Sequence, residues 1–296
     1  MALNTLSFAS KFTGELDKIV TSKAATGFFA DNVFRSKFVG AKTVIVPDID
    51  FVGLADYDRD NGFAKGATTI SQQSYTLTKD RGRQLQLDRE DLDETGVANL
   101  AGQVLGEFVR TKVVPEVDAY TLSKLAGVAK AQSHSYTEGT GGKYYADFID
   151  RVNSVRAAAG YDEEMVAFVD SSFYAGLVKT SEITRSIVVS DFKQGDVNLK
   201  VKSIDGVAII PVPDSRMKTA YTFGSNGFTA AENAKSIRLL VMPKKSASLV
   251  KKTETMRIFT PEQNKDADAY AFNYRLYYDV FVKKSNLGFI EAIISA

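Results

Sequence analysis

His134 is the single histidine of the chain and the first side chain to consider as a general base, because an imidazole titrates near neutral pH. It lies in AKAQSHSYTEGTGGKYY (129–145), a stretch rich in Gly, Ser and Thr, and the chain has no cysteine or second histidine to share a metal ion. No G-x-S-x-G motif supplies a nucleophilic serine. The sequence therefore favours an ordinary loop residue at 134, with a general base as the alternative.

The segment DYDRDNG (56–62) resembles the start of a calcium-binding loop, because Asp56, Asp58 and Asp60 alternate there. In such a loop the glycine comes sixth and a bidentate glutamate comes twelfth. Here Gly62 comes seventh, and Ala67 occupies the twelfth place. The pattern therefore favours a solvated turn, in which Asp and Asn side chains bond to the backbone, over a calcium site.

Two other patterns could indicate nucleotide or nucleic-acid binding. EGTGGKYY (138–145) is rich in glycine, but Lys143 is followed by tyrosine, and Thr137 stands where a phosphate loop has its first glycine. Near the C-terminus, aromatic residues interleave with Arg275, as in platforms that stack single-stranded nucleic acid: Tyr270, Phe272, Tyr274, Tyr277, Tyr278 and Phe281. With 37 basic and 36 acidic residues the chain has no basic field, which favours a packed sheet face or a subunit contact.

The composition describes a globular chain with no sulfur chemistry. The 296 residues are 44% hydrophobic and 25% charged, and they suffice for one large domain or two ordinary ones. The absence of cysteine excludes disulfides, thiolate metal sites and cysteine nucleophiles. The first residues lack a basic leader with an apolar core, and no run approaches the roughly 18 apolar residues of a membrane span, so we expect a cytoplasmic origin and no membrane.

Residues 53–91 form a heavily charged stretch whose flanks alternate like strands. In TVIVPDIDFVGLA (43–55) the apolar members are Val44, Val46, Ile49 and Phe51, and Pro47 restricts this strand to an edge or a bulge. The return limb contains TTISQQSYTLT and, after DRG, RQLQL, while the Asn-Gly pair in DRDNG suits a type I′ turn. Both strands exceed the usual length of about five to six residues. A two-stranded ribbon of this length is not stable alone, so something else must cover it.

Helical patterns precede and follow this hairpin. Residues 1–40 show helical spacing at Leu6, Phe8, Phe12, Leu16 and Ile19, and their later aromatics predict an arm that docks on another surface: Phe28, Phe29, Phe34 and Phe38. From Leu92 to Leu125 one apolar stripe predicts the longest element of the chain, capped by Asp93 or Thr95. Pro115 is expected to kink or break this helix.

Beyond the glycine-rich boundary near residue 140, strands and helices alternate. We predict a helix that Gly160 ends, a buried strand MVAFVD (165–170) and a helix SSFYAGLVKT (171–180) capped by Ser171 or Ser172. Two more strands follow in GVAIIPVPD (206–214) and SIRLLVM (236–242), and the aromatic strand over 270–278 closes the chain.

This order of elements, together with several phrases, resembles the major capsid proteins of tailed bacteriophages. KFVGAKTVIVPDIDFVGLADYDRDNGF and YTLTKDRGRQLQLDREDLDET are similar to the two limbs of that family's extended loop, and LGEFVRTKVVPEVDAYTLSKLA is similar to its spine helix. GVAIIPVPDSRM resembles the axial lobe, and RIFTPEQNKDADAYAFNYRLYYDVFV the C-terminal strands of the peripheral lobe. The resemblance implies an α+β fold with an N-terminal arm (1–40), an extended β-hairpin loop (41–90), a peripheral domain (91–135 and 243–296) and an axial α/β domain (136–242).

In that family the extended loop lies across a neighbouring subunit, which would cover its strands. The charges of the loop alternate in sign, as contact with a copy of the same chain requires. The resemblance therefore implies no catalytic, cofactor or metal site, and it suggests a set of inter-subunit contact residues: Asp56, Tyr57, Asp58, Arg59, Asp60, Asn61, Gly62, Lys79, Arg81, Arg83, Arg89 and Glu90.

The implied function is that of a head shell subunit. Copies would assemble in the host cytoplasm into hexamers and pentamers of an icosahedral virion that encloses double-stranded DNA without sequence-specific binding. A portal and a separate scaffold protein or protease would be partners during assembly. The lysine and asparagine that cross-link some relatives have no identifiable counterparts here. Two alternatives remain open: an encapsulin-type compartment, which has the same fold, and an α/β enzyme with the hairpin as a lid.

Overall fold

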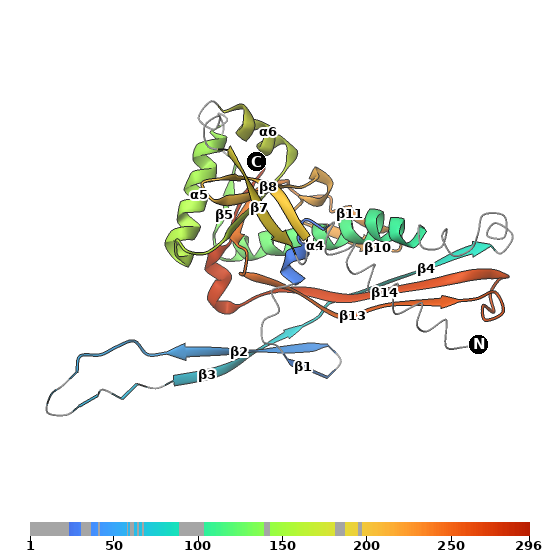
Figure 1. The fold of residues 1–296 in the computed structure, drawn as a ribbon, viewed down its shortest axis with the longest axis horizontal. Coiled ribbons are helices and arrows are strands. Elements are labelled where there is room, and N and C mark those ends of the chain that lie inside the picture. The colour runs from blue at the N-terminus through green and yellow to red at the C-terminus, as the bar shows by residue number, and fades with distance from the viewer. Residues whose placement is uncertain are drawn as a thin grey trace.

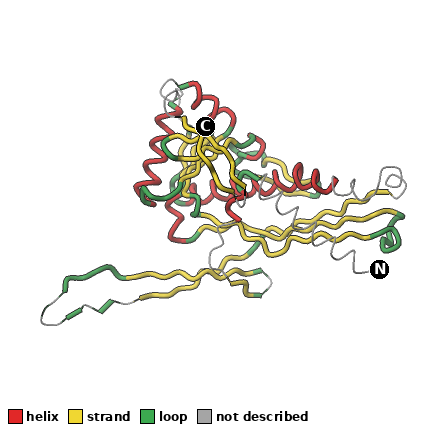
Figure 2. The backbone as a smooth tube through the Cα atoms, in the orientation of Figure 1, coloured by secondary structure: helices red, strands yellow, loops and turns green. Residues whose placement is uncertain are grey.

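The computed structural model describes residues 24–30, 37–40, 42–57, 59, 62–63, 65–66, 68–88, 104–138, 143–180, 187–194 and 197–296. A long hairpin projects from a body of sheets and helices (Figure 1). Figure 2 shows that the projecting part consists of strand and loop only, while the helices gather in the body. Among the described residues, no helix is long and apolar enough to cross a membrane.

A three-stranded antiparallel sheet lies along the long helix. Its order is β13 (Ala247–Phe259), β14 (Ala269–Val282) and β4 (Lys79–Asp88). Because successive side chains of a strand point to opposite faces, β14 serves two cores. Its members Phe272, Tyr274 and Tyr278 pack in the cluster that contains the helix, whereas Tyr277 and Phe281 pack in a second cluster with the hairpin.

The long helix runs without a break from residue 104 to residue 131. Near its start lies a π-helical turn, η2 (Val109–Val113), and α4 (Val114–Ala131) follows directly. The amide of Val114 donates to the carbonyl of Val109, and Pro115 next to it has no N–H to donate. The interruption expected at Pro115 is therefore a widened turn, as is common where an α-helix must absorb a misfit, and the helix does not end.

The second sheet has seven strands. Its order is β5 (Ser135–Thr137), β15 (Glu291–Ile294), β12 (Ile237–Pro243), β6 (Met165–Val169), β9 (Val207–Pro211), β8 (Val197–Ile204) and β7 (Ile187–Gln194). Helices α5 (Tyr144–Ala159) and α6 (Ser171–Lys179) cover one face, and α4 covers the other. Alternation along β6 accounts for this layering, because Val166 and Phe168 join the α4 cluster and Met165 and Val169 join the α5 cluster.

Most elements predicted in this lobe are confirmed, and two details differ. Gly160 ends α5 with φ +101°, as predicted. Helix α6 is capped by the carboxylate of Asp170, which accepts from the amide of Phe173 at 2.8 Å, so the expected caps Ser171 and Ser172 are wrong. In addition, β15 comes from the predicted peripheral segment but pairs with β12 inside this sheet.

The described part of the N-terminal arm docks on its own chain. Helix η1 (Gly27–Ala30) buries Phe28 and Phe29, and both rings lie 6.1 Å from the ring of Phe168. The buried carboxylate of Asp118 accepts from the amide of Thr26 at 3.0 Å and from its hydroxyl at 2.7 Å. Phe34, another aromatic residue of the predicted arm, lies outside the described residues.

The projecting hairpin pairs β2 (Thr43–Phe51) with β3 (Thr68–Thr76), and β1 (Lys37–Val39) adds a short third strand at its base. Beyond the end of β1, Pro47 lies where β2 has β3 as its one neighbour, which suits a residue without an N–H. The β2–β3 ladder ends at Phe51 and Thr68, and Asn61 of the predicted Asn-Gly turn lies outside the described residues.

A two-stranded hairpin completes the body. It joins β10 (Tyr221–Gly224) to β11 (Gly227–Ala230) through Ser225 and Asn226, and Gly227 has φ +109°. Short 3-10 helices lie at η4 (Asp214–Arg216) and η5 (Lys284–Phe289). The β10–β11 turn lies beside β4 and the long helix, where it helps to enclose a cavity.

Candidate assembly interface

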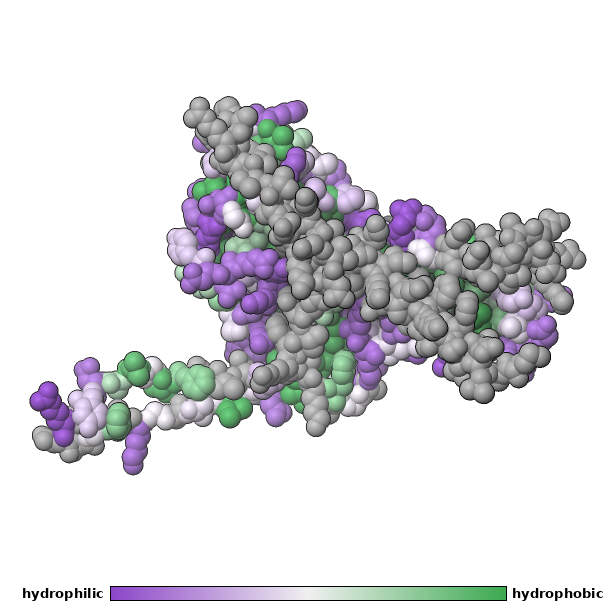
Figure 3. All heavy atoms as spheres, viewed as in Figure 1, coloured by the Kyte–Doolittle hydropathy of each residue, from purple (hydrophilic) through white to green (hydrophobic). Residues whose placement is uncertain are grey.

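The far part of the hairpin carries apolar side chains that its own chain does not cover. Phe51 and Ile70 are each 70% exposed, Phe63 is 88% exposed and Leu54 is fully exposed. Figure 3 shows hydrophobic (green) spheres along the projecting hairpin. Monomeric soluble proteins seldom leave several large apolar side chains together in water, and such patches mark contact sites. This segment is therefore the strongest candidate for a functional surface.

The apolar side of β2 changes face along the strand. Val44 and Val46 share one face and are buried against the body together with Leu77, Val250, Tyr277 and Phe281. Phe51 is an odd number of residues from Val46, so it belongs to the opposite face. The spacing was visible in the sequence, although the contact residues predicted there did not include Phe51. The body of the same chain buries the face with Val44 and Val46, and the face with Phe51 stays exposed.

The loop beyond the strands contains four of the predicted contact residues that the structure describes. Asp56, Tyr57 and Arg59 are exposed, and Gly62 adopts φ +81°, a backbone conformation that favours glycine. The ring of Tyr57 meets the ring of Phe63 edge-on at 4.9 Å. The remaining predicted residues of this loop and its return limb lie outside the described residues: Asp58, Asp60, Asn61, Arg89 and Glu90.

Lys79, Arg81 and Arg83 are not on the hairpin, so their predicted place in the extended loop is wrong. They lie in β4, which leaves β3 and pairs with β14 in the body. Arg81 Nε donates to Glu116 Oε1 of the long helix at 2.6 Å, and its Nη2 donates to the carbonyl of Gly224 at 2.9 Å. Arg83 Nη1 donates to the carbonyl of Ser225 at 2.8 Å. In the isolated subunit, the two arginines hold the β10–β11 turn beside the helix.

Lys79 also connects β4 to β10 and to the long helix, through contacts with two aromatic rings. Its Nζ lies 3.7 Å from the ring centre of Phe223 and 4.8 Å from that of Tyr120. Burial, and secondarily the positive charge of Arg81, lowers the pKa of Lys79. Burial also raises the pKa of Tyr120, whose hydroxyl donates to the buried carboxylate of Asp279 at 2.7 Å. This polar network joins β4, β10 and β14 to the long helix.

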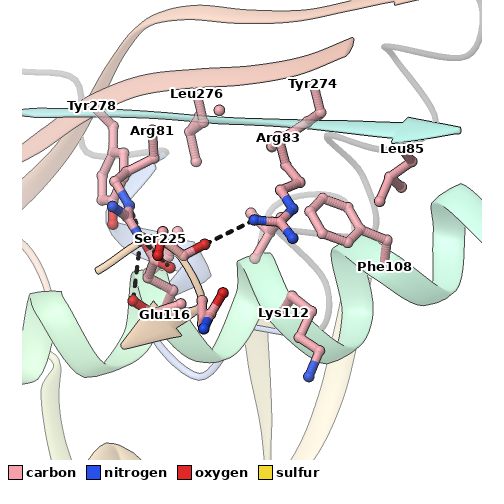
Figure 4. A pocket seen from close by; sticks show the side chains of 15 residues that line it. Arg81, Arg83, Leu85, Phe108, Lys112, Glu116, Ser225, Tyr274, Leu276 and Tyr278 are labelled. Atoms are coloured by element: carbon pink, nitrogen blue, oxygen red, sulfur yellow. Dashed lines mark hydrogen bonds and ion pairs between the residues drawn. The ribbon is translucent and has the colours of Figure 1, made fainter. Parts of the chain in front are cut away.

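A cavity of about 340 Å³ opens between β4, the long helix and the β10–β11 turn (Figure 4). Its apolar lining comes from side chains of the sheet and the helix: Leu85, Phe108, Val113, Val117, Tyr274 and Leu276. Its polar lining includes Arg81, Arg83 and Lys112 on the basic side and Glu116 on the acidic side. Because Arg81 and Glu116 pair with each other, the remaining charge at the mouth is positive.

Of the other patterns with possible chemistry, His134 is not part of the cavity lining, whereas the aromatic run of β14 contributes Tyr274 and Tyr278 to it. His134 follows α4, where its amide donates to the carbonyl of Ala129 at 2.8 Å, and its ring comes near Gly288. Tyr274, Tyr277 and Tyr278 are buried in β14, so the packed-sheet interpretation of the aromatic run is confirmed. Within the described ranges, no three His, Asp or Glu side chains converge on a possible metal position.

The fold is that of the major capsid proteins of tailed phages, as predicted. One similar structure is the capsid of the cyanophage P-SCSP1u, with a TM-score of 0.59, 11% identity, and coverage of 88% of this chain and 85% of that one. The mature capsid of bacteriophage PhiM1 has a TM-score of 0.55 and 12% identity, and the match covers 86% of this chain and 82% of that one. A virus-like particle from Pyrococcus furiosus has a TM-score of 0.55 and 11% identity, and the match covers 97% of this chain and 99% of that one. No protein-family model matches the sequence, and no curated protein matches it significantly.

These likenesses bear on the interpretation of the site. They span most of this chain, and they include both phage capsids and a virus-like particle. The shared property is the fold. At this level of identity the comparison concerns the fold, and the contact residues of this chain must be argued from its own surface.

Proposed function

We propose that the protein is the major capsid subunit of a tailed phage, forming hexamers and pentamers of an icosahedral head around double-stranded DNA. The observation that carries the proposal is the far part of the hairpin, where Phe51, Leu54, Phe63 and Ile70 stay exposed on a chain with a shell-subunit fold. A second copy that covers these side chains would bury them, since burial of a large apolar side chain contributes roughly 1.5–3 kcal/mol.

Near-neutral charge fits this role. A wall with a net charge of +1 does not bind DNA strongly through its phosphates, so packaged DNA remains free to move. In this proposal the region of the seven-stranded sheet (predicted axial domain, 136–242) surrounds the symmetry axes, and the hairpin bridges subunits. The finished protein is part of the virion, assembled in the host cytoplasm with a portal and a separate scaffold protein or protease.

Deletion of residues 56–66 tests the bridging role. The ladder between β2 and β3 ends at Phe51 and Thr68, so the deletion leaves that ladder and the buried base of the hairpin intact. We expect subunits with unchanged circular dichroism and unchanged urea unfolding that form no shells by light scattering and negative-stain imaging. Normal shells from the deletion variant would refute the bridging role.

A cargo compartment of the encapsulin type is the second candidate. The virus-like particle from Pyrococcus furiosus, with coverage of 97% and 99%, supports it to the same degree as the phage capsids support a head. The contents of particles purified from the native source separate the two, because a head holds nuclease-protected DNA and a compartment holds protein. The enzyme-with-lid alternative has less support, since the hairpin projects away from the cavity at β4 (Figure 1).

A further inference from the structure

We infer that Asp279 is a positioning residue that fixes the direction in which the hairpin projects from the body. The inference rests on the proposed shell function, because it names the contact within one subunit that would keep this direction constant. Its basis is a buried carboxylate that binds the residue where the chain passes from the hairpin into the body, Thr78.

The junction between the hairpin and the body consists of two residues, Leu77 and Thr78. Strand β3 ends at Thr76 and pairs with β2, whereas β4 begins at Lys79 and pairs with β14, so the chain changes sheets at this junction. Such a short link does not by itself fix the angle between two sheets, since each residue has two soft backbone dihedrals. The direction of the hairpin therefore depends on contacts made at the junction.

The carboxylate of Asp279 connects this junction to the long helix. The amide of Thr78 donates to Asp279 Oδ2 at 3.0 Å, and the hydroxyl of Thr78 donates to the same oxygen at 2.8 Å. On the helix side, the Tyr120 hydroxyl donates to Oδ1 at 2.7 Å, and Lys124 Nζ donates to it at 2.5 Å. Because a hydrogen bond requires both a distance and an angle, two bonds from Thr78 restrain its position and its rotation.

Burial makes this connection difficult to break. The side chain of Asp279 is fully buried in β14, while that of Lys124 is 33% exposed. A buried carboxylate that loses its donors keeps the cost of desolvation without compensation, so hairpin angles that separate Thr78 from Asp279 are disfavoured. Hydrogen bonds to an ionised carboxylate are also stronger than those between neutral groups.

The apolar contacts at the same base hold the hairpin on the body without selecting its direction. Val44 and Val46 pack in one cluster with the ring of Tyr277. The stabilisation from such burial depends on the area removed from water and has no preferred direction. The hydroxyl of Tyr277 donates to the carbonyl of Leu77 at 3.2 Å, so the shorter and charge-assisted bonds at the junction are those of Asp279.

A constant hairpin direction has a consequence for the proposed shell. The hairpin extends well beyond the body (Figure 1), so a small change of angle at Thr78 displaces its far end by a large distance. Contacts that repeat with a fixed rotation close into rings, whereas a variable rotation gives open or irregular assemblies. In this inference, Asp279 keeps the rotation the same in every subunit.

Distance measurements on the unassembled subunit test the positioning role apart from shell formation. The chain has no cysteine, so Ser71→Cys in β3 and Glu163→Cys in the body, both exposed, accept two spin labels. Pulsed electron paramagnetic resonance then records the distribution of their distances. Adding Asp279→Asn should broaden this distribution roughly twofold or more, because an amide nitrogen cannot accept a hydrogen bond.

A milder pair of variants keeps the test valid if Asp279→Asn does not fold. Thr78→Val removes one donor and leaves the bonds between Asp279 and the helix in place, while Thr78→Ser restores the hydroxyl. Thr76→Val makes the same exchange at an exposed residue of β3. We expect a broader distribution for Thr78→Val and wild-type widths for the other two. A contact with a merely structural role would lower the free energy of unfolding without changing the width, so equal widths for Thr78→Val and Thr76→Val would overturn the inference.

Assembly of the same variants gives the second readout. By negative-stain imaging, we expect irregular or open particles from Thr78→Val and uniform shells from Thr76→Val. Uniform shells from a Thr78→Val subunit with a broadened distribution would overturn the link between hairpin direction and assembly. A wild-type chain that forms no shells would instead overturn the proposed function, while the distances in the unassembled subunit would still decide the role of Asp279.

Discussion

The two ends of the projecting hairpin have the same backbone pairing but opposite surroundings. At the base, Val44 and Val46 are buried, and the ring of Tyr75 lies 4.9 Å from that of Phe281. At the far end the ladder continues to Phe51 and Thr68, yet Phe51 and Ile70 face water. The difference shows that pairing of two strands does not by itself bury their apolar side chains. An apolar face that stays exposed indicates contact with another chain.

The largest effect should come from the base. Phe281→Ala removes a ring that is 5% exposed and packs against Tyr75, so we expect the free energy of unfolding of the unassembled subunit to fall by about 3 kcal/mol. Urea unfolding followed by circular dichroism measures it. A loss below about 1 kcal/mol would mean that the base is not a true core.

The matched change at the far end, Phe51→Ala, should act on assembly and not on folding. Phe51 is 70% exposed, so the free energy of unfolding should stay within about 0.5 kcal/mol of wild type. If a neighbour buries this ring in the shell, its loss should raise the subunit concentration needed for assembly roughly tenfold or more, as light scattering would record. A folded variant that assembles as well as wild type would remove Phe51 from the interface.

A smaller effect is expected for the hydroxyl of Tyr75, which donates to the carbonyl of Val282 at 3.0 Å or to Gln73 Oε1 at 2.5 Å. Tyr75→Phe keeps the ring and should lower the free energy of unfolding by about 1 kcal/mol. Tyr57→Phe, at the exposed end of the same hairpin, is the control and should not change it. Equal losses at both positions would contradict the contrast between base and far end.

The smallest effect concerns Asp80 and Arg275, which pair at 2.5 Å on the face of the sheet toward which the hairpin base packs. The hydrogen bond from Arg275 lowers the pKa of Asp80 below its ordinary value of 3.8. A lowered pKa stabilises the fold above the ordinary value and loses that contribution as the pH falls through the folded-state pKa. Asp80→Asn should thus be slightly less stable than wild type at pH 7, and the difference should shrink as the pH falls below 3.8 and vanish once the pH lies below the lowered folded-state pKa. A difference that persists there would exclude an ionic origin.

Periodicity predicted the elements better than their partners. RQLQL alternates equally well whether it extends the hairpin or pairs with β14, so the sequence gives no sign that Arg81 and Arg83 belong to the body. The pairing of β15 with β12 could not be predicted either, because a short apolar run does not indicate which strand far away in the sequence is its partner. The Asp170 cap was missed because Asp and Ser have similar preference for that position.

Part of the candidate interface could be read from the chain. The hairpin and its need for a cover follow from alternation and strand length, whereas Asp56, Tyr57 and Arg59, which are exposed, were contact residues that the resemblance implied. The apolar contacts beyond Val46 could have been found from the odd spacing to Phe51, which changes the face. The cavity depends on three elements far apart in sequence, and no local pattern reports such a meeting.

In the proposed shell, a neighbouring subunit covers the far end of the hairpin. Phe51→Cys introduces the chain's one thiol, and its rate of reaction with a maleimide can be compared in unassembled subunits and in purified shells. We predict fast labelling of the subunits and labelling at least tenfold slower in the shells. Equal rates in both would contradict the account, because they would leave this face in water after assembly.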